Sequence, residues 1–316
     1  QQATSNKQQA TSNKQQATQL YMILLDGKKV SNDIKDEIAE EVQKMKDRGE
    51  KVPHLAAVLV GDDGASLTYV GSKVRACERI GFESTLVRMS NTTSELELLK
   101  KIHELNENDD IDGFIIQLPL PPQINTQKVL MAVNPDKDVD GFHPENFGKM
   151  ALDMSTFIPA TPFGILELLE RYDVETKGKH TVVIGRSHIV GRPMSILMGR
   201  RGFPGNSTVT LTHSHTKNIT QITCQADIII TALGRPNFLK AEMVKDDAII
   251  IDVGITRVPD ETRKRGYRIT GDVDFENVSK KVSHITPVPG GVGPMTIAML
   301  LKNTLLARER HIMAKK

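Results

Sequence analysis

A tyrosine and a lysine stand four positions apart in the segment 64–81, and this pair could handle protons. Tyr69 and Lys73 share one face of a helix, because helical side chains three or four positions apart are neighbours. Burial lowers the pKa of a lysine, so its amine can exchange protons near neutrality. The alternative is a core tyrosine beside a solvated lysine. The helix follows an apolar segment at 54–60, so its start should lie at the carboxyl edge of a parallel sheet, where ligands bind.

Two more polar residues could face the same cleft. Gln117 ends a second buried segment, 111–117, and so belongs to the same sheet edge. The sequence at 136–141 resembles the opening of a calcium loop, but its twelfth position is Phe rather than Glu, and we predict no metal site. Asp140 instead suits the N–H donors of a heterocycle. The alternative is an Asp-rich turn.

The segment after residue 184 has the pattern of a nucleotide-binding turn. Residues 181–184 are β-prone and lead into Gly185, and an apolar helical segment begins at Ile189. Glycine here lets backbone N–H groups approach a pyrophosphate, which the N-terminus of the following helix attracts. Ser187 occupies the place of the second glycine in the G-x-G-x-x-G pattern, so an ordinary strand-to-helix turn is the alternative.

Residues close to this turn favour NADP. A fold that prefers NAD usually places an acid about 20 residues after the first glycine, where it binds the ribose diol. Here His213, Ser214 and His215 follow the expected second strand, and Arg186 follows the glycine directly. A cation and hydroxyl donors suit a 2′-phosphate. The alternative is that these residues are simply exposed.

The order of elements predicts the architecture that positions these residues. Strands and helices alternate before and after a polar, loop-like stretch at 134–150, and a glycine-rich turn at 289–294 precedes the last helix, 295–308. Three glycines within four residues of that turn permit close backbone approach to a ligand. We predict an α/β protein with two parallel-sheet domains, the second a Rossmann-type dinucleotide-binding domain, and an active-site cleft between them.

We assign residues 22–160 and 291–316 to the first domain, because the last helix should pack back on it, and residues 161–290 to the second. Residues 1–21 contain a polar repeat of period seven, which we interpret as tag-like and outside the fold. A net charge of +2 does not indicate nucleic-acid binding. Two cysteines suggest a reducing compartment, and no apolar segment reaches membrane-spanning length.

Taken together, the segments resemble the bifunctional methylenetetrahydrofolate dehydrogenase/methenyltetrahydrofolate cyclohydrolase family. The similarity covers nearly the whole chain from about residue 25. The resembling motifs are Ser66-x-x-Tyr69-x-x-x-Lys73, Gln117-Leu-Pro-Leu-Pro121, Pro135-x-Lys137-Asp-Val-Asp140-Gly-Phe142, Pro159-x-Thr-Pro162, Gly185-Arg-Ser187, Asp252-Val-Gly-Ile255, Gly271-Asp-Val273 and Thr286-Pro-Val-Pro-Gly-Gly-Val-Gly-Pro-Met-Thr296.

The resemblance implies oxidation of 5,10-methylenetetrahydrofolate to the methenyl cation with NADP, followed by hydrolysis to 10-formyltetrahydrofolate. It implies that Lys73, hydrogen-bonded to Gln117, handles the proton of the hydrolysis, while Tyr69 stacks on the aminobenzoyl ring and Asp140 holds the pterin. The further folate contacts that it implies are Ile116, Leu118, Pro289, Gly290, Gly291, Val292 and Gly293. The implied cofactor contacts are Gly185, Arg186, Ser187, Ser214 and Ile255.

The resemblance also implies a homodimer formed through the cofactor domain and a cytoplasmic enzyme that acts on tetrahydrofolate derivatives. An extended segment at 200–207 is similar to mitochondrial members, some of which use NAD, so NAD is the alternative cofactor. Two other functions are weighed against the folate enzyme. One is a two-domain dehydrogenase of another small substrate, of shikimate or amino-acid type. The other is a non-catalytic dinucleotide-binding regulator.

Overall fold

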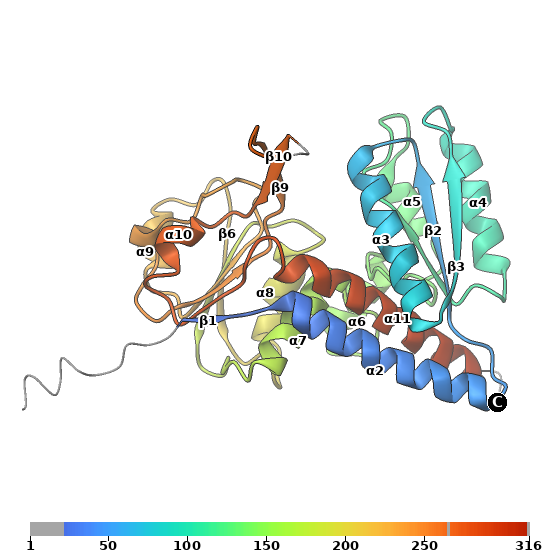
Figure 1. Cartoon of the computed structure of the whole chain (residues 1–316), viewed down its shortest axis with the longest axis horizontal. Coiled ribbons are helices and arrows are strands. Elements are labelled where there is room, and N and C mark those ends of the chain that lie inside the picture. The colour runs from blue at the N-terminus through green and yellow to red at the C-terminus, as the bar shows by residue number, and fades with distance from the viewer. Residues whose placement is uncertain (1–21, 264–265, 315–316) are drawn as a thin grey trace, which may run out of the picture.

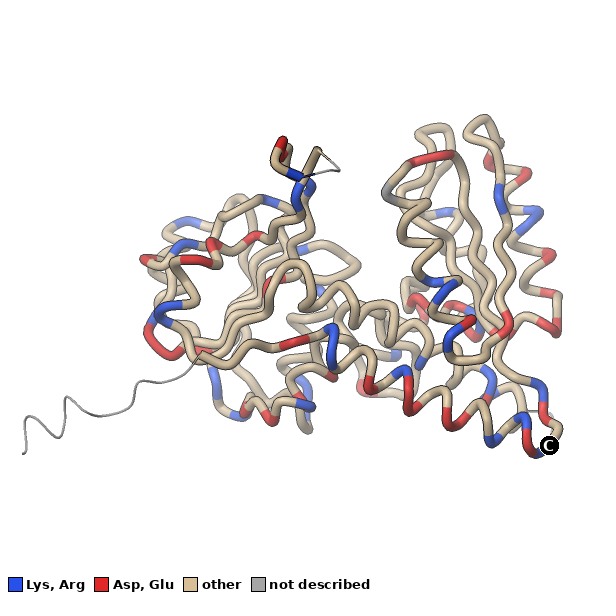
Figure 2. Tube along the Cα trace, viewed as in Figure 1, with Lys and Arg blue, Asp and Glu red and all other residues tan. Residues whose placement is uncertain are grey.

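The structure is a computed structural model that describes residues 22–263 and 266–314 and has two lobes joined by long helices (Figure 1). The repeat predicted at 1–21 lies outside these residues. Each lobe contains a parallel sheet, so the predicted fold class is confirmed. Figure 2 shows Lys and Arg interspersed with Asp and Glu over both lobes, in line with the near-neutral net charge. Among the described residues, no helix is both long and apolar enough to cross a bilayer.

The first lobe has a three-stranded sheet in the order β3-β2-β4, all parallel. The central strand β2 is buried along nearly its whole length, as its unbroken apolar sequence predicts. A capping box formed by Ser94 and Glu97 fixes the start of the helix α4. The elements are β2 His54–Val60, α3 Gly64–Ile80, β3 Glu83–Met89, α4 Glu95–Glu107, β4 Gly113–Ile116 and α5 Thr126–Ala132.

The second lobe has a six-stranded parallel sheet in the order β1-β11-β8-β7-β5-β6. The chain passes from β5 to β6 on one side and then to β7 on the other, so the carboxyl ends of β5 and β7 flank a topological switch point. Its strands are β1 Ile23–Leu24, β5 His180–Ile184, β6 Thr208–Thr212, β7 Ile228–Thr231, β8 Ile249–Asp252 and β11 His284–Ile285. Its helices are α8 Gly191–Gly199, α9 Ile219–Thr223, η1 Ala241–Met243 and α10 Phe275–Val278.

Three helices form a base that contacts both lobes. They are α2 Gly27–Asp47, α7 Ala160–Arg171 and α11 Val292–Ala314. The last of them packs on α2 and α7 and also contacts α3, β2 and β4 of the first lobe. Buried side chains of these helices and both sheets belong to one continuous apolar cluster. The sheet edges are therefore held in fixed positions around the space between the lobes.

Several local predictions were wrong. The stretch 134–150 is not all loop, because α6 Pro144–Ala151 begins there, with His143 as its N-cap and proline at its first position. The last helix is longer than the predicted 295–308, since it starts within the glycine-rich turn. A two-stranded antiparallel hairpin, β9 Thr256–Pro259 and β10 Tyr267–Thr270, was not predicted. Nor was β1, which joins the six-stranded sheet through β11 although residue 22 onward was assigned to the first domain.

Candidate functional site

A cavity of about 300 Å³ lies between the two lobes, and Lys73 is among its lining residues. Eight of the predicted folate contacts line it: Tyr69, Lys73, Ile116, Gln117, Leu118, Asp140, Val292 and Gly293. They come from α3, from the end of β4, from the loop before α6 and from the start of α11. The cavity also includes Ile189, Val190 and Ile255 of the second lobe. The sheet edges thus converge as the sequence predicts.

Lys73 and Gln117 make the central polar contact of this cavity. The Lys73 ammonium donates to the side-chain oxygen of Gln117 at 3.2 Å. The amide nitrogen of Gln117 donates to the Leu118 carbonyl at 2.8 Å, which turns the amide oxygen toward the lysine. Burial lowers the pKa of Lys73, and the negative charge of Asp140 opposes this effect. Burial raises the pKa of Asp140, and the positive charge of Lys73 opposes this rise. The cavity therefore holds an amine and a carboxyl group whose charges depend on each other.

The loop that carries Asp140 is held by buried polar side chains. Lys137 extends into the lobe, and its ammonium donates to the carbonyls of Leu105 and Asn108 at 3.0 and 2.7 Å, which satisfies the end of α4. One oxygen of Asp138 accepts from the His143 backbone at 2.7 Å and from Asn146 at 2.9 Å. These contacts fix the backbone on both sides of Asp140.

A second cavity, of about 680 Å³, continues from the first toward the hairpin β9–β10. The two cavities share Tyr69, Val253, Ile255, Val292 and Gly293. The predicted contacts Pro289, Gly290 and Gly291 line the second cavity only. Gly290 has a φ of +111°, and a Cβ on Gly291 would lie 2.6 Å from the Pro287 carbonyl oxygen. The turn thus needs glycine for its own geometry and leaves its backbone exposed to a ligand.

The turn after β5 has the geometry of a dinucleotide-binding loop. Gly185 has a φ of +116°, and a Cβ there would lie 2.3 Å from the Ala232 carbonyl oxygen, across the switch point. A Cβ on Gly191 would lie 2.0 Å from the Gly185 carbonyl oxygen. The Ser187 hydroxyl accepts from the backbone of Val190 and Gly191 at 3.2 and 3.3 Å, so it satisfies two backbone N–H groups at the start of α8. These residues fit a pyrophosphate at the helix N-terminus.

Arg186 and Ser214 lie at the carboxyl edge of β5 and β6, exposed and outside both cavities. Burial lowers the pKa of His213, and the charges of Arg186 and His215 lower it further. Ser214 follows His213 directly, and no acid occupies the turn at 213–216. A cation and a hydroxyl without a carboxylate fit a 2′-phosphate better than a free ribose diol.

Several residues of the site stand in the motifs quoted above, but the sequence offered no reason to assign them a role. Phe142, Thr161 and Thr296 line the first cavity, and the hydroxyls of Thr161 and Thr296 lie 3.0 Å apart. Asp252 and Asp272 are buried beside the second cavity. The Asp252 carboxylate accepts hydrogen bonds from the backbone N–H groups of Gly254, Asp272 and Val273. The Asp272 carboxylate in turn accepts hydrogen bonds from the backbone N–H groups of Leu233, Gly234 and Arg235. An aspartate that ends the apolar run of β8 was the available signal for this network.

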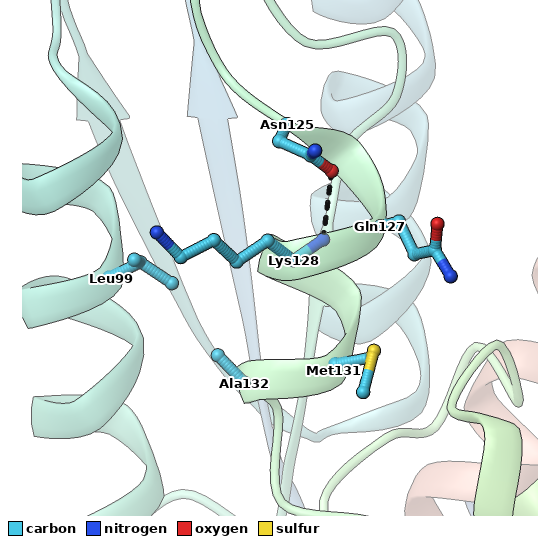
Figure 3. A pocket seen from close by; sticks show the side chains of 6 residues that line it. All are labelled: Leu99, Asn125, Gln127, Lys128, Met131 and Ala132. Atoms are coloured by element: carbon cyan, nitrogen blue, oxygen red, sulfur yellow. Dashed lines mark hydrogen bonds between the residues drawn. The ribbon is translucent and has the colours of Figure 1, made fainter.

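A third hollow lies on α4 and α5, away from these two cavities. Its lining includes Leu99, Met131 and Lys128, whose backbone donates to Asn125 (Figure 3). The Lys128 ammonium pairs with Glu95, so the charge of this lysine is balanced within the protein. It shares no lining residue with the cavity of Lys73. Within residues 22–263 and 266–314, no group of three or more His, Cys, Asp or Glu is arranged to hold a metal ion.

Two family models match the chain. The model for the tetrahydrofolate dehydrogenase/cyclohydrolase catalytic domain matches residues 25–140. The model for the NAD(P)-binding domain of the same family matches residues 159–312. Among curated proteins, the bifunctional protein FolD of Flavobacterium psychrophilum is 84% identical over 290 residues, which is 92% of this chain and 99% of that protein. FolD of Bacteroides fragilis is 57% identical over 291 residues, 92% of this chain and 99% of that protein.

Solved structures agree with this similarity. The FolD enzyme of Campylobacter jejuni is 46% identical and superposes with a TM-score of 0.86 over 92% of this chain and 99% of its own. The enzyme of Trypanosoma brucei, solved with NADP and an inhibitor, is 36% identical with a TM-score of 0.88 over 92% of this chain and 98% of its own. On these matches and on the site geometry, the chain belongs to the tetrahydrofolate dehydrogenase/cyclohydrolase family.

Proposed function

We propose that the chain oxidises 5,10-methylenetetrahydrofolate with NADP and then hydrolyses the 5,10-methenyl product to 10-formyltetrahydrofolate. The observation that carries this proposal is the hydrogen bond from Lys73 to Gln117 inside a cavity that also reaches the second lobe. Membership of the family supports both activities. One site can therefore serve two consecutive steps on the same one-carbon bridge.

For the oxidation, NADP supplies the acceptor for a hydride. The chain contributes binding and alignment. The turn at Gly185 and the start of α8 receive the pyrophosphate, while Ile255 of the second lobe lines both cavities. Tyr69 and the backbone of Pro289–Gly293 flank the folate. Fixing the donor carbon against the acceptor ring supplies most of what a hydride transfer needs from a protein.

For the hydrolysis, water must add to the bridging carbon and lose a proton before one carbon–nitrogen bond opens. Lys73 is the group placed to take and return that proton, because its pKa is lowered by burial. Gln117 holds the amine in place through its oxygen. Asp140 accepts hydrogen bonds from the pterin and, as a negative charge, limits the fall in the lysine pKa. The three side chains thus divide proton transfer, orientation and binding among them.

Arg186, Ser187 and Ser214 support NADP over NAD. Arg186 directly follows Gly185, and Ser214 stands after β6, where NAD-specific folds place an acid. The Ser187 hydroxyl accepts hydrogen bonds from the backbone at the start of α8. The 2′-phosphate would then be neutralised by a guanidinium, which binds such groups through two parallel hydrogen bonds.

Replacing the catalytic lysine tests the proposal. We expect Lys73→Met to reduce hydrolysis of added methenyltetrahydrofolate about 10²- to 10⁴-fold, while the dissociation constant of NADP changes little. Absorbance assays of each half-reaction and a titration of NADP provide the measurements. Arg75→Met, an exposed cation on the same helix, serves as the control. An unchanged hydrolysis rate in Lys73→Met would refute the role assigned to Lys73.

A dehydrogenase of another small substrate is the competing function. NADP reduction with a shikimate- or amino-acid-type compound, and none with methylenetetrahydrofolate, would establish it. The match to both domain models of the folate family favours the folate reaction. Tight NADP binding without turnover of either kind would indicate a non-catalytic regulator.

We further propose that residues 22–160 with 291–316 form the folate-binding domain and residues 161–290 the cofactor-binding domain, with β1 paired in the sheet of the second lobe and Pro289 and Gly290 at the folate. We also propose a cytoplasmic enzyme that forms a homodimer through its cofactor domain. Light scattering on the purified protein would then give twice the chain mass of 35.0 kDa. A mass equal to one chain at micromolar concentration would rule out the dimer.

A further inference from the structure

Asp252 closes the base of the hairpin β9–β10 from inside the second lobe. It is the last residue of β8, and its side chain is buried. One carboxylate oxygen accepts from the backbone of Gly254, shortly before the hairpin, and of Asp272, shortly after it, at 2.9 and 3.0 Å. The other oxygen accepts from the Val273 backbone at 3.0 Å. The two segments that enter and leave the hairpin are therefore bonded to one carboxylate.

Asp272 extends this contact to the loop after β7. Its side chain is buried, and one oxygen accepts from the backbone of Leu233 and Gly234 at 2.6 and 3.1 Å. The other oxygen accepts from the Arg235 backbone at 2.7 Å. Asp252 and Asp272 thus join the loop after β7 to both ends of the hairpin, and we call this pair of residues the aspartate clamp.

The aspartate clamp depends on its carboxylates and on two glycines. A Cβ on Gly271 would overlap the Asp252 carboxylate, and a Cβ on Gly254 would lie 2.5 Å from a carboxylate oxygen of Asp272. Burial raises the pKa of Asp252, and the backbone hydrogen bonds oppose this rise. An amide side chain of the same shape has an acceptor at only one of its two ends, so it cannot accept all of these hydrogen bonds.

The segments that the aspartate clamp holds lie where a dinucleotide should bind. The strands β5 and β7 flank the switch point of the sheet, and a Cβ on Gly185 would meet the carbonyl of Ala232, directly after β7. Gly234 and Ile255 line the larger cavity, and Ile255 also lines the smaller one. A displacement of the aspartate clamp would therefore move parts of the walls of both cavities.

The site assigned to the 2′-phosphate determines which half of the cofactor reaches these segments. Arg186 and Ser214 are assigned to that phosphate, so the adenosine half lies on the β6 side. In the order β8-β7-β5-β6, the strands β7 and β8 lie on the other side of β5. A dinucleotide bound across the switch point thus places its nicotinamide half at the loops after β7 and β8. Lys73 and Gln117, in contrast, belong to the first lobe.

We infer that the aspartate clamp positions the loops after β7 and β8 for the nicotinamide half of NADP, and that it serves the oxidation but not the hydrolysis. This inference rests on the proposed function. Asp252 and Asp272 take no part in either chemical step and act as positioning residues, through the backbone that they bind. Hydrolysis consumes no cofactor and uses side chains of the first lobe, so a change in the aspartate clamp should separate the two activities of one site.

Asp272→Asn tests the inference in the full-length enzyme. The variant keeps the shape of the side chain, but its amide nitrogen would face a backbone N–H group and displace the loop 233–235. We expect the KM and the dissociation constant of NADP to rise about three- to tenfold, while kcat for hydrolysis of added methenyltetrahydrofolate, measured without NADP, stays within about twofold. Equal losses of oxidation and hydrolysis would overturn the inference, and so would unchanged NADP constants.

Asp227→Asn is the matched control. Asp227 belongs to the same lobe, and its carboxylate accepts from the His180 backbone at 2.7 Å and pairs with Lys245. It directly precedes β7, so it lies at the amino edge of the sheet, opposite the aspartate clamp. We expect its replacement to leave the NADP constants unchanged. A rise as large as that in Asp272→Asn would overturn the inference, because it would indicate a general effect of damage to this lobe.

Thr231→Val provides a milder second variant if Asp272→Asn does not fold. The buried Thr231 hydroxyl donates to Asp252 at 3.1 Å, and valine keeps its shape. We expect the dissociation constant of NADP to rise about two- to fivefold with hydrolysis unchanged, and the absence of a rise would overturn the inference. A wild type that binds NADP without oxidising methylenetetrahydrofolate would instead refute the proposed function, while the NADP dissociation constants of the variants would still test the aspartate clamp.

Discussion

Burial shifts the pKa values of Lys73 and Asp140, and the charge of each group opposes the shift of the other. Desolvation alone would drive both groups toward their neutral forms, and each charge keeps the other partly ionised. Two groups coupled in this way titrate as a pair rather than separately. The pH dependence of the hydrolysis therefore reports on the carboxyl group as well as on the amine.

Removing the carboxylate charge should shift this dependence. In Asp140→Asn the pKa of Lys73 loses the effect that raises it, so the limb of the pH profile that reports Lys73 should move to lower pH. The measurement is kcat for hydrolysis at saturating methenyltetrahydrofolate across the pH range. Glu78→Gln removes an exposed charge from the same helix as Lys73 and should leave the limb in place. A limb that stays fixed in Asp140→Asn would contradict the coupling.

Arg186 offers a second test at a single side chain. Arg186→Gln should raise the KM for NADP about tenfold and leave the KM for NAD nearly unchanged, because only NADP has a 2′-phosphate for the guanidinium to bind. Steady-state kinetics with each cofactor measure the ratio. Arg201→Gln, an exposed arginine of the segment 200–207, is the control. Equal changes for both cofactors would show that Arg186 does not discriminate between them.

The polar residues at the ends of apolar segments were accessible from the sequence, whereas the threonines that packed helices contribute to the cavity were not. Lys73 and Gln117 follow from their positions at the ends of apolar segments. Thr161 and Thr296 come from α7 and α11, which are separated by more than a hundred residues and meet only through helix packing. A threonine inside an apolar helix has no pattern that distinguishes a cavity wall from an ordinary core position.

At the scale of elements, the loop between α5 and α6 depends on a buried carboxyl group. Burial raises the pKa of Asp138 from its ordinary 3.8 to about 6, although hydrogen bonds from Asn146 and the His143 backbone act in the opposite direction. Between these two pH values the folded protein binds more protons at this group than the unfolded chain. Its contribution to the free energy of unfolding therefore falls as the pH rises through this window.

Asp138→Asn should remove this pH dependence. Between pH 5 and pH 7.5, the stability of the wild type relative to the variant should fall by about 1 kcal/mol. Urea unfolding of both proteins at the two pH values gives the difference. Asp136→Asn, at an exposed position of the same loop, should show no such change. If the difference in free energy of unfolding between wild type and Asp138→Asn is the same at both pH values, Asp138 is already ionised at pH 5.

The sequence predicts most strands of both sheets and the helices of the first lobe, because their apolar runs have one clear period. It fails where an element is short or polar. The hairpin strand Thr256–Pro259 is half exposed and ends in proline, and β1 has two residues. For α6, the signal was present in Pro144 at the first helical position, but Gly148 and neighbouring polar residues obscured it.

At the scale of the whole molecule, α11 ties the Asp140 loop to the base. Asn303 is buried, and its amide nitrogen donates to the carbonyls of Val139 and Ile158 at 2.8 and 3.0 Å. Farther along the helix, Arg308 and His311 lie 3.6 and 3.2 Å from the buried carboxylate of Asp112. One helix therefore starts at the glycine turn of the cavity, supports the catalytic loop and ends beneath the first sheet.

Loss of the asparagine should weaken the fold and the site together. Asn303→Ala should lower the free energy of unfolding by about 1–3 kcal/mol, because two buried carbonyl groups lose a donor. Chemical denaturation gives the stability, and the KM for methylenetetrahydrofolate reports the displacement of Asp140. Gln43→Ala, on the exposed side of α2, should change neither quantity. Full stability in Asn303→Ala would show that other groups satisfy these carbonyls.

The pairing of α2 with α11 has a consequence for biosynthesis. A nascent chain exposes α2 and the first three-stranded sheet to the cell long before Val292–Ala314 has left the ribosome. During that interval the apolar surface that the final helix will cover has no native partner. The lobe that carries the lysine must therefore mature after translation of the cofactor lobe, and molecular chaperones have a defined period in which to protect it.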